Sequence, residues 1–144
     1  MGRARVSTRA VVDTSGIFKW FVAYCEGGID QAWDLLRSHQ RGELSLAAPL
    51  SVLVEVANLL RYSGVGVGDA VALLGELERT HLVLFDVTPE RARKALECAF
   101  ENRITEYDAL FLALAQELEC PLVTADRRAF GRIDASVAQV QLVL

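Results

Sequence analysis

Four carboxylates stand in the sequence where a charged side chain is costly unless it has a specific partner. Asp13 follows the apolar run RAVV, and Asp126 follows PLVTA, so each acid comes just after an expected strand. Glu55 interrupts the apolar segment SVLVEVANLL, and Asp108 stands at the entrance of the apolar segment DALFLALA. A carboxylate in such surroundings must be solvated, paired or bound to a cation.

Each acid also has an ordinary structural interpretation. Asp13 and Asp126 could form Asx turns or helix caps. Asp108 follows Thr105 at the spacing of a capping box, with its charge near the positive end of a helix. Glu55 could belong to a solvent-facing stripe shared with the polar residues that follow it. None of the four acids is therefore diagnostic when it is considered alone.

Convergence of the four acids would imply metal chemistry. Two like charges about 4 Å apart repel each other by about 4 kcal/mol at an effective dielectric constant of about 20, so a cluster stays ionised only with a cation. A site built only from oxygen ligands favours Mg²⁺ or Mn²⁺ over zinc. These ions favour phosphoryl chemistry, because they polarise a phosphate, activate a water molecule and stabilise the leaving oxygen.

The hydrophobic pattern predicts an α/β fold that could position these acids. Strands are expected at 9–13, 44–47, 81–87, 121–124 and 137–144, and helices at 14–24, 29–40, 51–62, 69–79, 88–101 and 105–118. Thr14 or Ser15 is expected to cap the first helix, and Asp69 a later one. The runs AVV, LVLF and PLVT lack polar alternation, which is typical of buried parallel strands between layers of helices. Ligands of such sheets gather at the carboxyl ends of the strands.

Composition limits the remaining possibilities. The 144 residues indicate a single domain over 1–144, with 1–8 expected to be a flexible end. There are 15 basic and 19 acidic residues, a net charge of −4, so a globally basic nucleic-acid surface is excluded. Three widely spaced cysteines indicate free thiols and a cytoplasmic protein. No apolar run approaches the length of a membrane span, and no secretory signal is recognisable.

Several segments together resemble a known family. VVDTS at 11–15, VEVANLL around Glu55, YDALFLALA at 107–115 and LVTAD at 122–126 look like the PIN domain. The phrases DALFLALA and LVTADRRAF look more narrowly like the VapC toxins of VapBC toxin–antitoxin pairs. The resemblance implies a three-layer α/β/α fold with a small, mostly parallel sheet. It also implies metal-dependent endonucleolytic cleavage of RNA, with tRNA or rRNA as the substrate.

The resemblance further implies roles for individual residues. Asp13, Asp108 and Asp126 would hold Mg²⁺ or Mn²⁺, and Glu55 would act through a bound water. The hydroxyl residues Thr14 and Thr124 would support this quartet. The expected products are a 5′-phosphate and a 3′-hydroxyl. The family also implies a VapB-like antitoxin partner and a homodimer.

Other interpretations stay open at this stage. Arg127 and Arg128 could contact RNA phosphates, or they could belong to an exposed helical turn whose charges are solvated. A PIN-like scaffold could bind RNA or protein without cleaving it, or a PIN ribonuclease could act outside a toxin–antitoxin pair. An aspartate-nucleophile phosphatase fits poorly, because it needs a second aspartate two residues after Asp13, where this chain has Ser15.

Overall fold

The computed structural model describes residues 8–21 and 29–142. The strands in these ranges are β1 (Thr8–Val12), β2 (Leu44–Pro49), β3 (Val83–Phe85), β4 (Leu122–Thr124) and β5 (Val140–Leu142). The helices are α1 (Thr14–Phe18), α2 (Ile29–Gln40), α3 (Val52–Arg61), α4 (Val67–Arg79), α5 (Pro89–Asn102), α6 (Glu106–Glu117) and α7 (Arg127–Phe130). None of these helices is long and apolar enough to cross a membrane.

The strands form one parallel sheet in the order β3-β2-β1-β4-β5. The chain adds β2 and β3 on one side of β1, and it then adds β4 and β5 on the other side. The strand order therefore reverses between β1 and β4, and ligands of open α/β sheets bind outside the carboxyl ends of the strands at such a point. Asp13 and Asp126 follow these two strands, so both acids lie at the reversal.

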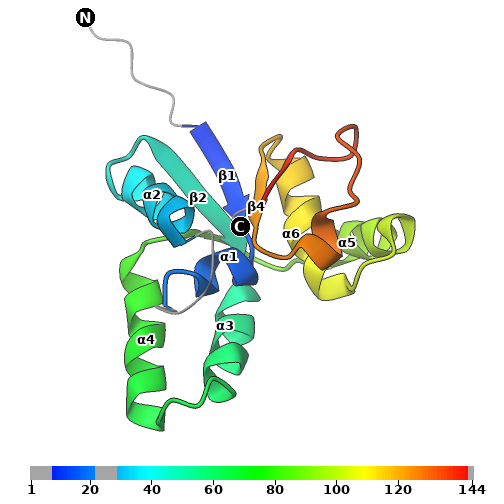
Figure 1. Cartoon of the computed structure of the whole chain (residues 1–144). Coiled ribbons are helices and arrows are strands. Elements are labelled where there is room, and N and C mark those ends of the chain that lie inside the picture. The colour runs from blue at the N-terminus through cyan, green and yellow to red at the C-terminus, as the bar shows by residue number, and fades with distance from the viewer. Residues whose placement is uncertain (1–7, 22–28, 143–144) are drawn as a thin grey trace, which may run out of the picture.

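Helices cover both faces of the sheet, as the sequence predicts. Figure 1 shows α2 and α6 on the two sides of the strands. Helix α2 contacts β2, whereas α6 contacts β1, β2 and β4 and is itself covered by α5. Helices α3 and α4 pack against each other at the end of the sheet where α1 begins (Figure 1).

Helix α6 is buried on nearly all sides because its sequence is apolar around the whole circumference. Its buried residues are Ala109, Leu110, Phe111, Leu112, Leu114 and Ala115. A helix enclosed between the sheet and α5 has little freedom to shift. The position of Asp108, one residue before this buried run, is consequently fixed by the core.

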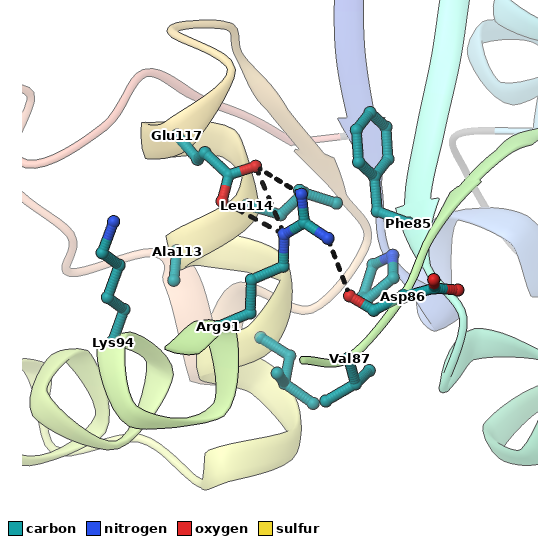
Figure 2. A pocket seen from close by; sticks show the side chains of 10 residues that line it. Phe85, Asp86, Val87, Arg91, Lys94, Ala113, Leu114 and Glu117 are labelled. Atoms are coloured by element: carbon teal, nitrogen blue, oxygen red, sulfur yellow. Dashed lines mark hydrogen bonds and ion pairs between the residues drawn. The ribbon is translucent and has the colours of Figure 1, made fainter. Parts of the chain in front are cut away.

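Arg91 ties α5 to α6 and to the exit of β3 (Figure 2). Its guanidinium donates to both carboxylate oxygens of Glu117, with an Nε–Oε1 distance of 3.1 Å and an Nη2–Oε2 distance of 3.1 Å. It also donates to the backbone carbonyl of Asp86 at 3.0 Å and lies over the ring of Phe85. The Arg91 side chain thus links three elements, and this is a second reason why the position of α6 is fixed.

The N-terminal region departs from the sequence prediction in two ways. Helix α1 ends at Phe18 instead of continuing to 24, and 22–28 lie outside the described residues. Its cap is Asp13, whose side chain accepts from the Gly16 amide, so the expected Thr14 or Ser15 cap is wrong. Within the expected flexible end 1–8, Thr8 is already paired with Leu44 in the sheet, and 1–7 are not described.

Further along the chain, several element boundaries differ from the prediction. Gly66, not Asp69, is the N-cap of α4. Strand β3 is shorter than predicted at both ends, and at its start His81 has a left-handed φ of 53°, which is outside the extended region of a strand. The last strand, β5, starts at Val140 rather than at 137. Helix α7 confirms the interpretation of Arg127 and Arg128 as part of an exposed helical turn.

Candidate active site

Asp13 is held at the carboxyl end of β1 by three hydrogen bonds. Its Oδ1 accepts from the Ser15 hydroxyl at 2.8 Å and from the Gly16 amide at 2.9 Å. Its Oδ2 accepts from the Thr124 hydroxyl of β4 at 2.6 Å. The parallel pairing of β1 with β4 brings the two residues together, since Val12 pairs with Val123 just before them. Asp13 and Thr124 are both buried, so this link is shielded from solvent.

Burial makes the charge of Asp13 expensive. Desolvation raises its pKa to about 6, and the nearby charge of Asp108 adds to the effect, although the three hydrogen bonds oppose it. At neutral pH the Asp13 carboxyl is mostly ionised, and its buried charge raises the free energy of the folded protein. A bound cation would relieve that energy.

Glu55 and Asp108 approach Asp13 from two further elements. Glu55 projects from α3, and burial, followed by the charges of Asp108 and Asp13, raises its pKa to about 7. Asp108 belongs to the first turn of α6, and burial with a contribution from Asp126 raises its pKa as well. The mutual effects show that all four carboxylates share one electrostatic environment. The interpretation of Glu55 as part of a purely solvent-facing stripe is therefore wrong.

Asp126 is both a helix cap and a wall of the site. Its Oδ1 accepts from the Ala129 amide at 3.0 Å and so caps α7. Asp13 caps α1 in the same manner through Oδ1. The interpretation of both residues as helix caps is confirmed. The capping hydrogen bond uses only one oxygen of Asp126 and leaves its second oxygen available to the cleft.

One cleft brings together the side chains of all four acids. We refer to it as the acid cleft, and it is lined by Asp13, Thr14, Ser15, Val54, Glu55, Asn58, Leu59, Tyr107, Asp108, Phe111 and Asp126. Thr14 borders it directly, whereas Thr124 acts from behind through its hydrogen bond to Asp13. Arg127 and Arg128 lie on α7, are exposed, and do not line this cleft.

Sequence reasoning missed the contribution of Ser15. Its hydroxyl donates to Asp13, lies 3.2 Å from the Thr124 hydroxyl and accepts from the Ala125 amide. It therefore joins the segment after β1 to the segment after β4. Asn58 and Tyr107 were also not singled out, and both line the cleft. Asn58 stands three residues after Glu55, at the spacing of one helical face, which was a usable signal.

The donor set fits a divalent cation that prefers oxygen. The cleft is lined by carboxylate, hydroxyl and amide oxygens, and the Glu55 carboxylate interacts with the hydroxyls of Ser51 and Thr14. Among the described residues, no three acidic, histidine or cysteine side chains converge tightly enough to form a complete ligand set. An ion that keeps several of its waters suits such an open cleft, and Mg²⁺ behaves in this way.

With the geometry established, comparison with known proteins identifies the family. A family model of the PIN domain matches residues 10–136. The chain belongs to the PIN domain family. A search of curated proteins gives no significant match.

Solved structures with the same fold cover most of this PIN domain. A DNA-bound VapBC from Salmonella typhimurium has a TM-score of 0.70 at 15% identity and covers 95% of this chain and 99% of that chain. VapBC2 from Rickettsia felis, bound to a promoter DNA fragment, has a TM-score of 0.69 at 16% identity, with 94% and 98% covered.

VapC20 from Mycobacterium tuberculosis, a toxin that cleaves the sarcin-ricin loop, has a TM-score of 0.67 at 20% identity, with 85% and 93% covered. At identities this low, the likeness to all three structures shows the fold.

Proposed function

We propose that this PIN domain is a metal-dependent endoribonuclease and the toxin of a type II toxin–antitoxin pair. The observation that carries the proposal is the meeting of Asp13, Glu55, Asp108 and Asp126 in one cleft at the strand-order reversal of a PIN fold. Carboxylates from four separate segments, three of them with raised pKa values, are an arrangement that costs stability and therefore indicates function.

Different residues of the cleft would have different roles in the hydrolysis. Asp13, Asp108 and Asp126 would hold Mg²⁺ or Mn²⁺, and Glu55 would act through water. When bound, the cation would polarise the scissile phosphate, activate a water molecule and stabilise the departing 3′-oxygen. Glu55, whose carboxylate interacts with the Ser51 and Thr14 hydroxyls, would accept a proton from water.

The neighbouring hydroxyl groups keep this arrangement in place. Thr124 and Ser15 fix both oxygens of Asp13, so that the carboxylate needs no reorganisation when a cation arrives. Thr14 borders the cleft, and its hydroxyl interacts with the Glu55 carboxylate and would support that residue. The products would carry a 5′-phosphate and a 3′-hydroxyl.

The biological setting that we propose is a cytoplasmic toxin with tRNA or rRNA as its substrate. A VapB-like antitoxin would hold it inactive, and the active form would be a homodimer. The antitoxin partner is supported by solved structures with this fold that are VapBC complexes, and an RNA substrate by VapC20, which cleaves the sarcin-ricin loop.

The enzymatic part of the proposal is tested by an RNA cleavage assay. Purified protein is incubated with bacterial tRNA and rRNA in Mg²⁺, Mn²⁺ or EDTA, and the fragments are resolved on gels. Asp13→Asn and Asp108→Asn are expected to abolish cleavage and to keep the fold. Asp69→Asn, an exposed acid in α4, is the matched control and should cleave as the wild type does.

The outcomes separate the alternatives. Equal cleavage by the wild type and both cleft variants would refute the assignment of the site. RNA binding without cleavage in any metal would favour a PIN module that only binds.

The toxin role needs a separate experiment in cells. Induced expression is expected to stop bacterial growth, Asp108→Asn should not, and co-expression of the adjacent small reading frame should restore growth. Cleavage in vitro without growth arrest would favour a PIN ribonuclease outside a toxin–antitoxin pair.

A further inference from the structure

The imidazole ring of His39 joins backbone groups from two segments that are distant in the sequence. Its Nδ1 accepts from the Leu46 amide of β2 at 3.0 Å. Its Nε2 lies 2.8 Å from the carbonyl oxygen of Thr80 and 3.2 Å from that of His81. His39 is the second-last residue of α2, so one side chain holds the turn between α4 and β3 to strand β2. We refer to these three contacts as the His39 bridge.

The bridge lies where the pairing of β2 with β3 begins. The first paired residues are Ala47 and Val83, and Leu46 comes just before Ala47. On the other side, His81 has a left-handed φ of 53°, which is outside the extended region of a strand. The ring thus provides hydrogen bonds to backbone groups that lie beyond the end of the ladder.

The partners of the ring fix its protonation state. A backbone amide can only donate and a carbonyl oxygen can only accept, so Nδ1 must be without a proton and Nε2 must carry one. The bridge is complete only in this neutral tautomer. A second proton, on Nδ1, would place two N–H groups against each other, and the amide of the buried Leu46 would lose its acceptor.

The charged and titratable side chains on the segments around His39 are exposed. Two of the arginines have acidic partners, since Arg37 pairs with Asp34 and Arg79 with Glu76. Among the described residues, no side chain forms a hydrogen bond or an ion pair with the His39 ring, so its backbone partners determine its preferred state. The exposed groups on these segments are Arg37, Arg41, Glu43, Glu78, Arg79 and His81.

We infer that the His39 bridge is an acid-sensitive switch, which holds the α4–β3 turn to β2 while the ring is neutral and releases the turn when the ring is protonated. The inference does not depend on the proposed function. The turn follows α4, and α4 packs against α3, which carries Glu55. Release of the turn therefore loosens the attachment to the sheet of the helix pair that borders the acid cleft.

The direction of the pH effect follows from proton binding. The bridged ring cannot take a second proton without losing the Leu46 bond, whereas the ring of the released state is open to water. Below about pH 6.5, where a free histidine ring becomes protonated, the released state binds one more proton than the bridged state. Its population should then rise by up to about tenfold for each further pH unit.

The test is amide hydrogen exchange of the whole chain, followed by NMR at about pH 5 and about pH 8 and corrected for the intrinsic pH dependence of exchange. Local exchange is measured because Asp13 and Glu55 titrate in the same range and change the global stability. In the wild type, protection of the Leu46 and β3 amides should fall at the lower pH by about tenfold or more, relative to the amides of α6.

Three variants separate the bridge from its surroundings. His39→Gln offers an acceptor and a donor at every pH, so its protection should not depend on pH, and His39→Ala should be poorly protected at both pH values. His81→Asn is the matched control, because it replaces the only other histidine, keeps the backbone carbonyl and tolerates the left-handed conformation. It should behave as the wild type does.

Several results would overturn the inference. One is an equal loss of protection at low pH in the wild type and in His39→Gln, and another is a pH effect that disappears in His81→Asn. Full protection in His39→Ala at about pH 8 would show that the bridge holds nothing in place. Nitrogen NMR of the imidazole should show the proton of His39 on Nε2 at that pH, and a proton on Nδ1 would contradict the bridge itself. None of these measurements uses RNA, so their outcome is independent of the nuclease assay.

Discussion

Replacing Asp13 by asparagine is expected to stabilise the metal-free protein at alkaline pH. The Asp13 side chain is nearly completely buried, and its pKa rises from the usual 3.8 to about 6. A shift of roughly two pKa units corresponds to about 3 kcal/mol of folding free energy, which the ionised carboxylate costs the folded state. Asparagine has nearly the same size without the charge, so the variant does not carry this cost.

The sign of the effect follows from proton binding. The folded state keeps the Asp13 proton to a higher pH than the unfolded chain does. Between about pH 4 and pH 6 the folded protein therefore binds more protons, and its stability falls as the pH rises through that window. The difference between the variant and the wild type should be small near pH 4 and complete above about pH 7.

The hydrogen bonds around Asp13 survive the replacement. The amide oxygen can accept from Ser15 and from the Gly16 amide, and the amide nitrogen can donate to the Thr124 hydroxyl. The pKa of about 6 already includes the stabilisation of the charged form by these three hydrogen bonds, so the expected net gain stays at about 3 kcal/mol.

The assay is urea denaturation in EDTA, followed by circular dichroism at about pH 4.5 and about pH 8. Asp69→Asn, an exposed acid, serves as the control and should change little at either pH. A variant that is no more stable than the wild type at the higher pH would refute the reasoning, because the buried carboxylate would then ionise without a cost.

Three further results are expected. Mn²⁺ binding should tighten as the pH rises through about 6 to 7, because the cation competes with protons on Asp13 and Glu55; calorimetry that shows a flat affinity would contradict this. Mn²⁺ at about 100 times its Kd should stabilise the wild type by about 2.7 kcal/mol in thermal denaturation, and Asp108→Asn should lose most of that gain. Arg91→Ala should destabilise the protein by about 1 kcal/mol in urea, with Arg91→Lys intermediate, since its pair with Glu117 is partly exposed.

Much of the fold could be predicted because the strands and helices carry strong local patterns. The unbroken apolar runs of β1 and β4 indicate a buried parallel sheet, and the all-round apolar sequence of α6 indicates a buried helix. Boundaries set by single backbone conformations could not be predicted. The left-handed His81 precedes the shortened β3, and the bounds of α7 depend on the Asp126 cap of a segment too short to show a period.

The candidate site was predictable in its members but not in its arrangement. Each of the four acids could be selected because its surroundings are apolar or because it follows a strand. Their meeting depends on the strand order, which places β4 beside β1. The role of Ser15 depends on a contact with Thr124, 109 residues away in the sequence, and no local pattern reveals such a contact.

The chemistry of the cleaved ends is the most direct measurement of metal-assisted hydrolysis in the acid cleft. Fragments produced in Mg²⁺ or Mn²⁺ should carry a 5′-phosphate and a 3′-hydroxyl, because water attacks the phosphorus and the 3′-oxygen leaves. Asp108→Asn should yield no fragments. Ends that carry a 2′,3′-cyclic phosphate would show that the RNA's own 2′-hydroxyl is the nucleophile, and cleavage that persists in EDTA would show that no metal is needed. Either result would contradict the proposed mechanism.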